Sequence, residues 1–189
     1  MADRQPTRQH LPFRLRFVRD RDGATAVEFA MIALPFLGLI AGIIELGLLF
    51  MGSVALDNAM QTASRRIRTG ELTSPAGATG AQKEASRQAF RDEICNGMGF
   101  LAADCKVKLS IDVKTVTNFT DITMTSPIQG GTFNAGSLTF DPGTGGSLVM
   151  VTAYYRWTMF MPLMNQALQR LPGETLLTSV LTFRNEPFA

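Results

Sequence analysis

The longest hydrophobic pattern in the sequence is an apolar run near its N-terminal end. Phe29 to Ile44 contains no charged residue, and beyond Glu45 the chain stays apolar or small up to Leu56. An α-helix rises about 1.5 Å per residue, so roughly 20 residues cross the hydrocarbon layer of a membrane. The pattern therefore predicts a single membrane-spanning helix from Val27 to about Phe50, which continues outward as a stalk to about Arg68.

Charged residues flank this predicted helix in an unusual way. The segment before it carries six arginines against three aspartates and ends at Gly23, and Glu28 then lies near the start of the apolar run. An unpaired carboxylate at that depth costs on the order of 2–3 kcal/mol. A chain cut after Gly23 would begin at Ala24, whose amino group is a cation about one helical turn from Glu28 of the same or a neighbouring copy. Cleavage here would supply the partner that the carboxylate lacks.

A basic leader, a glycine and then Ala-Thr-Ala-Val-Glu-Phe resemble the processing site of type IV prepilins. In those proteins a membrane peptidase cuts after the glycine, and glutamate is the fifth residue of the mature chain. The longer stretch GATAVEFAMIALPFLGLIAGIIELG, with Pro35 and the Glu45-Leu46-Gly47 triplet, is similar to the TadE-like family of minor pilins or pseudopilins of the tight-adherence (Flp) pilus. The closing TFRNEPF also resembles the ending of that family.

The resemblance implies a division of the chain into a cytoplasmic leader at 1–23, a transmembrane helix with its stalk at 24–69, and an exported domain at 70–189. It implies cleavage between Gly23 and Ala24 by a prepilin peptidase. The mature protein would then work in pilus assembly, through contacts with other pilin-like subunits and the Tad inner-membrane machinery. The resemblance implies no small-molecule substrate.

Small residues recur on one face of the predicted span. Gly38 and Gly42 are four residues apart, as are Ala41 and Glu45, and small residues let a neighbouring helix approach closely. Glycine is also frequent in membrane helices that have no such partner. We predict that Gly38 and Gly42, together with Glu28 and Glu45, pack against other subunits. For Glu45 a second interpretation is open, in which its carboxylate simply extends to the membrane surface.

Charge asymmetry predicts the topology. The leader has a net charge of +3, whereas the remaining chain has 12 basic and 13 acidic residues and a net charge of −1. The positive-inside tendency places the leader in the cytoplasm and the C-terminal domain in the periplasm of a bacterial inner membrane. The balance gives no sign of a nucleic-acid partner. A signal peptide cut after Ser53-Val54-Ala55 is a rival interpretation, but its apolar region would be far longer than the usual 7–15 or so residues.

Beyond the apolar run the periodicity predicts a small α+β domain. A helix is expected from about Ala81 to Asn96, and a short helix at Pro162 to Leu171, with proline in its first turn. Strands are expected at Lys106 to Thr117, Leu148 to Met161 and Thr175 to Arg184. This order of elements is typical of a mainly antiparallel sheet packed against one or two helices.

Two parts of the predicted domain have alternative interpretations. Asn118 to Ser147 is rich in Thr, Ser and Gly and is expected to be a long surface loop or an irregular hairpin. It is either a contact with a subunit or surface, or an insertion that the fold tolerates. Tyr154, Tyr155 and Trp157 lie on an alternating strand, which favours core and sheet-face packing over a binding platform.

The candidate chemistry is limited. Cys95 and Cys105 both lie in the predicted exported domain, where thiols oxidise, so a disulfide contributing about 2–3 kcal/mol is expected, with two free buried thiols as the alternative. His10 is the only histidine and belongs to the leader. Cleavage after Gly23 would leave none, which excludes histidine-dependent catalysis and histidine-bound metals.

We therefore expect no enzymatic activity, no cofactor and no metal site. The leading hypothesis is a membrane-bound assembly protein of a pilus. A second hypothesis is an uncleaved, signal-anchored periplasmic binding or scaffold protein. A third, a membrane-tethered hydrolase, would need a convergent polar site that the sequence does not show.

Overall fold

The computed structural model describes residues 23–72, 78–121, 124 and 126–188. The predicted leader lies almost wholly outside the described residues. By internal contacts the chain divides into two compact units, with the boundary in the sequence between Ala41 and Gly42.

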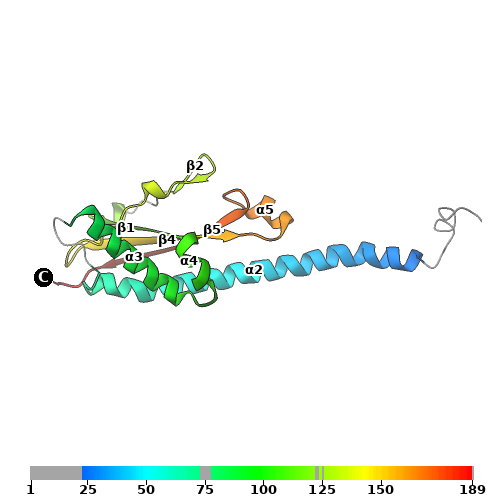
Figure 1. The fold of residues 1–189 in the computed structure, drawn as a ribbon, viewed down its shortest axis with the longest axis horizontal. Helices are drawn as coiled ribbons and strands as arrows, with labels where there is room; N and C mark the ends of the chain where they lie inside the picture. Colours follow the sequence, from blue (N-terminus) through cyan, green and yellow to red (C-terminus); the bar gives the residue numbers. More distant parts are fainter. Residues whose placement is uncertain (1–22, 73–77, 122–123, 125, 189) are drawn as a thin grey trace, which may run out of the picture. The chain divides into compact units, whose positions relative to one another are not determined.

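Helix α2, Ala24–Arg68, is the first element (Figure 1). Its first backbone bond runs from the Val27 N–H to the Gly23 carbonyl at 3.2 Å, and the helix continues through Pro35. Between Ala24 and Ala41 nearly every side chain is exposed. This part of α2 therefore presents an apolar surface on all sides.

From Gly42 onward α2 has two different faces. Its buried positions recur at intervals of three and four residues, as expected for one stripe of a helix: Gly42, Glu45, Gly52, Leu56, Ala59, Met60, Ala63, Ser64 and Ile67. The opposite face is exposed, apolar as far as Val54 and polar from Asp57. The predicted stalk is thus an integral part of the folded unit and its core.

Three long strands form the main sheet, which confirms the predicted α+β fold. They are β1 (Leu109–Val116), β4 (Leu148–Thr158) and β5 (Glu174–Arg184). The order is β1-β4-β5 and both pairings are antiparallel. The central strand β4 pairs Ala153 with Ile111 on one side and with Ser179 on the other.

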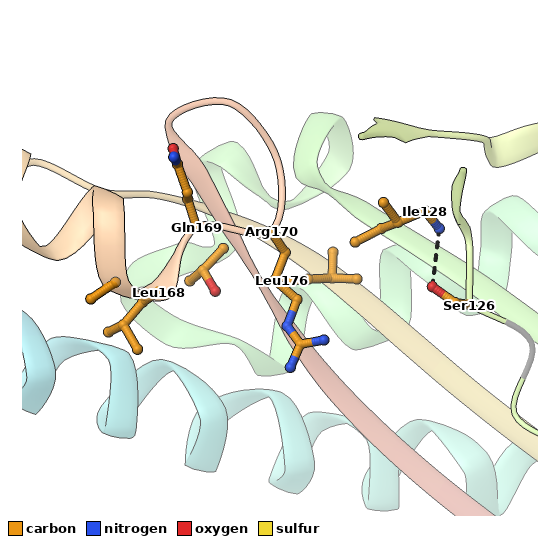
Figure 2. Close-up of a pocket in the computed structure, with 8 residues that line it drawn as sticks. Ser126, Ile128, Leu168, Gln169, Arg170 and Leu176 are labelled. Carbon is orange, nitrogen blue, oxygen red and sulfur yellow. Dashed lines mark hydrogen bonds between the residues drawn. The ribbon is translucent and has the colours of Figure 1, made fainter. Parts of the chain in front are cut away.

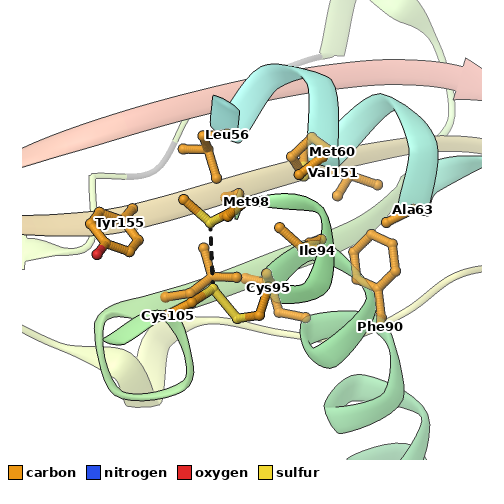
Figure 3. Close-up of a cluster of buried hydrophobic side chains, with 14 of the residues drawn as sticks. Leu56, Met60, Ala63, Phe90, Ile94, Cys95, Met98, Cys105, Val151 and Tyr155 are labelled. Carbon is orange, nitrogen blue, oxygen red and sulfur yellow. Dashed lines mark hydrogen bonds between the residues drawn. A yellow bond between two sulfur atoms is a disulfide. The ribbon is translucent and has the colours of Figure 1, made fainter. Parts of the chain in front are cut away.

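Helices cover one face of this sheet. Figure 3 shows Leu56 and Met60 of α2 facing Ile94 of helix α3 (Gly80–Gly97) above Val151 of β4. The sheet contributes the alternating residues Val149, Val151, Ala153, Tyr155 and Trp157, all of them buried. The predicted packing role of the aromatic residues of this strand is therefore confirmed.

The segment before β4 covers part of the other face of the sheet. In the predicted surface loop, β2 (Ile128–Gln129) and β3 (Thr132–Phe133) form a small hairpin, and the Phe133 ring meets Tyr154 edge-on at 6.4 Å. Asp112 is 3% exposed, accepts from the Thr139 N–H at 2.7 Å and pairs with Lys114 at 2.7 Å. This part of the loop closes the second layer of the domain.

The predicted strand from Lys106 is wrong over its first three residues. Helix α4 spans Ala102–Lys108, after a short 3-10 turn at Gly99–Leu101, and β1 begins only at Leu109. The Asp104 carboxylate pairs with Lys108 one helical turn later at 3.3 Å. This pair stabilises a helix even though polar and apolar residues alternate here as they would in a strand. Val107 is 77% exposed, as a residue on the outer side of this helix.

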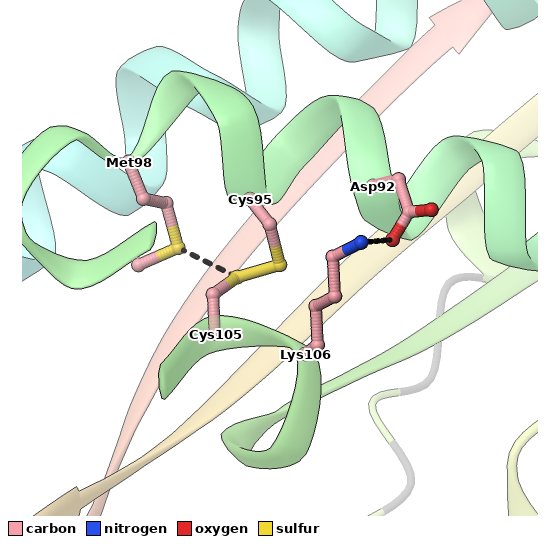
Figure 4. The surroundings of a disulfide bond; sticks show 5 residues. All are labelled: Asp92, Cys95, Met98, Cys105 and Lys106. Carbon is pink, nitrogen blue, oxygen red and sulfur yellow. Dashed lines mark hydrogen bonds and ion pairs between the residues drawn. A yellow bond between two sulfur atoms is a disulfide. The ribbon is translucent and has the colours of Figure 1, made fainter. Parts of the chain in front are cut away.

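A disulfide joins α3 to α4. Cys95 and Cys105 are bonded, with Cα atoms 5.4 Å apart, and both are buried (Figure 4). The Met98 Sδ lies 3.4 Å from Cys105 Sγ, a packing contact because a bonded sulfur carries no hydrogen. Asp92 and Lys106 form an ion pair at 3.2 Å beside the bond. The bond and the ion pair fix α4 against α3.

Helix boundaries otherwise follow the sequence closely. Thr79 caps α3 in a reciprocal capping box with Gln82, and α5 (Pro162–Leu168) starts at the expected proline but ends three residues early. The small residues Ala85 and Ala89 of α3 are exposed. Phe90, Ile94 and Met98 carry the buried stripe instead.

The hydroxyl groups of the two buried tyrosines, Tyr154 and Tyr155, have raised pKa values. Burial raises the pKa of Tyr154, and the nearby Asp112 carboxylate raises it further. Burial and Asp104 raise the pKa of Tyr155 in the same direction. Both side chains therefore stay neutral over the physiological range and act as packing groups with a polar end.

The close approach of α2 to the sheet generates a first prediction. A Cβ at Gly52 would lie 3.0 Å from Trp157 Cζ3 and 3.2 Å from Leu177 Cδ1, whereas a Cβ at Gly47 would meet no atom within 4 Å. Gly52→Val should therefore destabilise the full chain by about 1–3 kcal/mol. Thermal unfolding in detergent micelles, followed by circular dichroism, measures this.

Gly47→Val is the matched control, since it adds the same side chain to the same helix on the exposed face. We expect its melting temperature to stay close to that of the parent chain. Equal losses in the two variants would show that helix propensity, and not contact with the sheet, explains the glycine at position 52.

Candidate functional site

The predicted processing site lies at the first turn of α2. Ala24 is the first helical residue, and Gly23 and Glu28 are exposed. An added Cβ at Gly23 would meet no atom within 4 Å, so nothing in the fold of this chain requires glycine there. The assignment of Gly23, Ala24 and Glu28 to processing stays a prediction, and it depends on what a peptidase recognises.

The exposed surface of the helix is strongly apolar. Large hydrophobic side chains that are more than half exposed recur along it: Val27, Phe29, Met31, Ile32, Leu34, Phe36, Leu37, Leu39, Ile43, Ile44, Phe50 and Val54. Among the described residues α2 is the one helix long and apolar enough to cross a membrane. Such a surface is compatible with a single-pass membrane protein, because water would solvate it poorly.

Glu45 interrupts this apolar helix, and the structure gives its carboxylate a specific partner. The side chain is fully buried, with 0% exposure. Its Oε1 accepts from the Phe160 N–H at 2.8 Å and its Oε2 accepts from the Met161 N–H at 3.1 Å. One carboxylate thus satisfies two adjacent backbone donors that lie more than a hundred residues away in sequence.

These two N–H groups have no backbone partner because they lie between a strand and a helix. Strand β4 ends at Thr158 and α5 starts at Pro162, so the N–H groups of Phe160 and Met161 take part neither in the sheet hydrogen bonds nor in those of the helix. Buried donors without a partner are costly. Hydrogen bonds to a charged acceptor are among the stronger ones, and Glu45 supplies two of them at this strand-to-helix turn.

The small residues of α2 have different surroundings. A Cβ at Gly42 would lie 3.5 Å from Met164 Cε of α5, in ordinary contact, while a Cβ at Gly38 would meet nothing within 4 Å. The structure therefore gives Gly42 and Glu45 neighbours within the chain. A role of either residue in packing between subunits stays a prediction, as does the role of Gly38. The interpretation that Glu45 extends to the membrane surface is wrong, since its carboxylate is buried.

The C-terminal ending closes the opposite end of the folded unit. Asn185 is 3% exposed, and its side-chain amide donates to the carbonyls of Pro142 at 2.9 Å and Thr144 at 3.1 Å. The Glu186 N–H donates to the Arg68 carbonyl at 2.9 Å, and the two side chains pair at 3.6 Å. The ending therefore holds the last turn of α2 against the turn that precedes β4.

Comparison with protein families gives one result. Residues 23–65 match the model of the family described as TadE-like protein. This segment is TadE-like. Comparison with curated proteins and with solved structures gave no match. The match relates the segment to pilin-like proteins associated with the Tad pilus and covers the predicted processing and packing residues on α2.

Sequence reasoning missed the partners of two buried polar groups outside the TadE-like segment. Asp112 is an acid within a predicted strand, and Asn185 lies in the family-like ending. A lone acid or amide within a strongly β-forming stretch is a weak signal, because its partner lies on a distant loop. The sequence shows that Glu45 is an acid within an apolar run. Its partners, however, are backbone groups, which no side-chain motif marks.

Other hollows on the surface carry less chemistry. Figure 2 shows one between Ser126–Ile128 and the segment after α5, lined by Leu168, Arg170 and Leu176 among others. Ser126 accepts from the Ile128 N–H at 3.3 Å, and no general base lines the hollow. Within the described ranges no group of three His, Cys, Asp or Glu side chains is placed to hold a metal ion.

The geometry of Glu45 generates the second prediction. Glu45→Ala removes the acceptor for two N–H groups, so we expect amide hydrogen exchange at Phe160 and Met161 to rise by roughly 10- to 100-fold, since a bond to a charged group contributes about 1.5–3 kcal/mol. Exchange followed by mass spectrometry on the full chain in micelles measures this at the level of short peptides.

Glu28→Ala is the control, because Glu28 is an exposed acid on the same TadE-like helix. It should leave exchange in the peptide containing residues 159–164 unchanged. Protection that survives in Glu45→Ala would show that the carboxylate does not hold this turn.

Proposed function

We propose that this protein is a minor pilin or pseudopilin of a Tad (Flp-type) pilus, a structural protein without catalytic activity. It is made as a precursor with a leader at 1–23, is cut between Gly23 and Ala24, and keeps a transmembrane helix with its stalk at 24–69. The domain at 70–189 is exported to the periplasm. The observation that carries the proposal is the TadE-like match on a helix whose apolar surface is exposed.

Exposed apolar surface on α2 supports action by helix packing. Between Ala24 and Ala41 the helix has no folded layer of its own unit around it, so lipid or other helices are its natural partners. Gly38 offers open space for a second helix. The proposed partners are the lipid bilayer, other pilin-like subunits and the Tad inner-membrane machinery, with a prepilin peptidase acting first.

Glu28 differs from Glu45 in having no buried contact of its own in the structure. It remains an acid within the apolar part of the helix, and a cation beside it would reduce the cost of placing it in lipid. A mature amino group at Ala24 is such a cation. We therefore assign Glu28 to pairing with the amino terminus of its own or a neighbouring subunit.

The third prediction concerns processing. Gly23→Ala should block cleavage, because the peptidase is proposed to recognise glycine, while the fold is unaffected since the added Cβ has open space. Intact-mass measurement of the protein from native membranes, together with N-terminal sequencing, distinguishes precursor from mature chain. Identical mature masses for parent and variant would refute the site. A parent chain that still contains His10 would favour an uncleaved anchored protein.

The fourth prediction concerns assembly. Glu28→Ala should insert into membranes normally but recover much less of the other pilin-like subunits on co-purification, because the amino-terminal cation loses its partner. Asp57→Ala is the matched control, since Asp57 is an exposed acid of the same helix beyond its apolar part. Unchanged recovery in Glu28→Ala, or equal loss in both variants, would contradict the pairing role.

A further inference from the structure

The segment that links β4 to β5 is unusually poor in charge for a surface element. We define the tip as residues 159–171, which contain α5. From Thr158 to Gly173 the one charged residue is Arg170. Phe160 is 53% exposed and Leu168 is 39% exposed. The tip therefore combines exposed apolar side chains with very little charge.

The tip lies against α2 at a definite level. Its backbone binds Glu45 through Phe160 and Met161, and Met164 lies next to Gly42. At that level the opposite side of α2 exposes Ile43 and Leu46, which are 61% and 40% exposed. The helix is therefore flanked by the tip on one side and carries an open apolar face on the other.

The apolar face of α2 continues well beyond the tip. Phe50 is 76% and Val54 is 55% exposed, and the first charged residue after Glu45 is Asp57. At about 1.5 Å per residue, Val54 lies roughly 13 Å farther along the helix than Glu45. If lipid covers this face up to Val54, the tip lies within the membrane boundary rather than above it.

We propose that the tip is embedded in the headgroup layer of the membrane leaflet on the domain side, with anionic phospholipid as its partner. The proposal rests on the proposed membrane span and adds a second point of contact to it. Exposed Phe160 and Leu168 enter the layer beside the apolar face of α2, and exposed Arg170 reaches phosphate groups. Lipid that covers the exposed side of α2 at this level would also surround the tip on the other side of the helix, which favours lipid over a separate protein partner.

In this layer the Glu45 contact would also satisfy backbone donors that lipid cannot satisfy. A strand-to-helix turn leaves backbone donors open, and lipid offers little to satisfy them. Glu45 satisfies both donors from within the helix, so the turn can enter a poorly hydrated environment without uncompensated N–H groups. Burial of the carboxylate on the tip also removes it from the lipid-facing side of α2.

The experiment uses single thiols on the full chain reconstituted in phosphatidylethanolamine and phosphatidylglycerol vesicles. Both native cysteines are in the disulfide, so an introduced cysteine is the reactive thiol. Phe160→Cys reports on the tip. Phe119→Cys is the matched control, because Phe119 is 67% exposed and follows β1 at the opposite end of the sheet. Phe50→Cys reports on the helix.

Each thiol carries a small fluorophore, quenched either by headgroup nitroxide lipids or by aqueous iodide. We expect the Phe160 label to be quenched by the lipids and shielded several-fold from iodide, with the reverse for Phe119. Equal iodide quenching at Phe160 and Phe119, with lipid quenching at Phe50, would overturn the tip proposal and leave the span intact.

Two further outcomes would also overturn the tip proposal. No lipid quenching at Phe50 would remove the span on which it rests. Shielding of the Phe160 label that depends on protein density, without quenching by nitroxide lipids, would mean that a second copy covers the tip. None of these readings depends on cleavage or pilus assembly, so they are separate from the tests of the proposed function.

Discussion

The buried carboxylate of Glu45 is the interaction on which the arrangement of this protein depends. A carboxyl group with no exposure needs hydrogen-bond partners, and here the N–H groups of Phe160 and Met161 each donate to one of its two oxygens. Either side left alone would be unfavourable, because the acceptor is fully buried and both hydrogen bonds are partly buried. The pair therefore fixes which level of α2 meets the end of β4, and the register of the helix along the sheet follows.

From Gly42 onward one face of α2 lies in the core of the domain and the other face is exposed. Its stripe from Gly42 to Ile67 completes the core of the domain, while its other face stays apolar to Val54. Gly52 lets the helix approach the ring of Trp157, and Arg68 at its end is held by the C-terminal ending. A membrane-type helix and a folded domain thus share one element, without a linker between them.

The sequence predicted the long helix, its apolar character and the antiparallel sheet because these depend on periodicity and length. It failed where a distant contact decides the outcome. Lys106 to Lys108 alternate like a strand, yet the disulfide and the Asp104 pair hold them in α4. Glu45 was recognised as unusual, but its partners are main-chain groups that any residue type supplies, so only the fold reveals them.

The shared helix also bears on where the chain can be cut. Cleavage after Gly23 removes nothing that the described core uses. A cut after Ala55, as a secretory signal peptide would require, removes Glu45 and Gly52 together with more than two thirds of α2. The N–H groups of Phe160 and Met161 would lose their acceptor, and Trp157 would lose part of its cover. The domain therefore needs the second half of α2 for its own core, and this favours the proposed cut after Gly23 over a cut after Ala55.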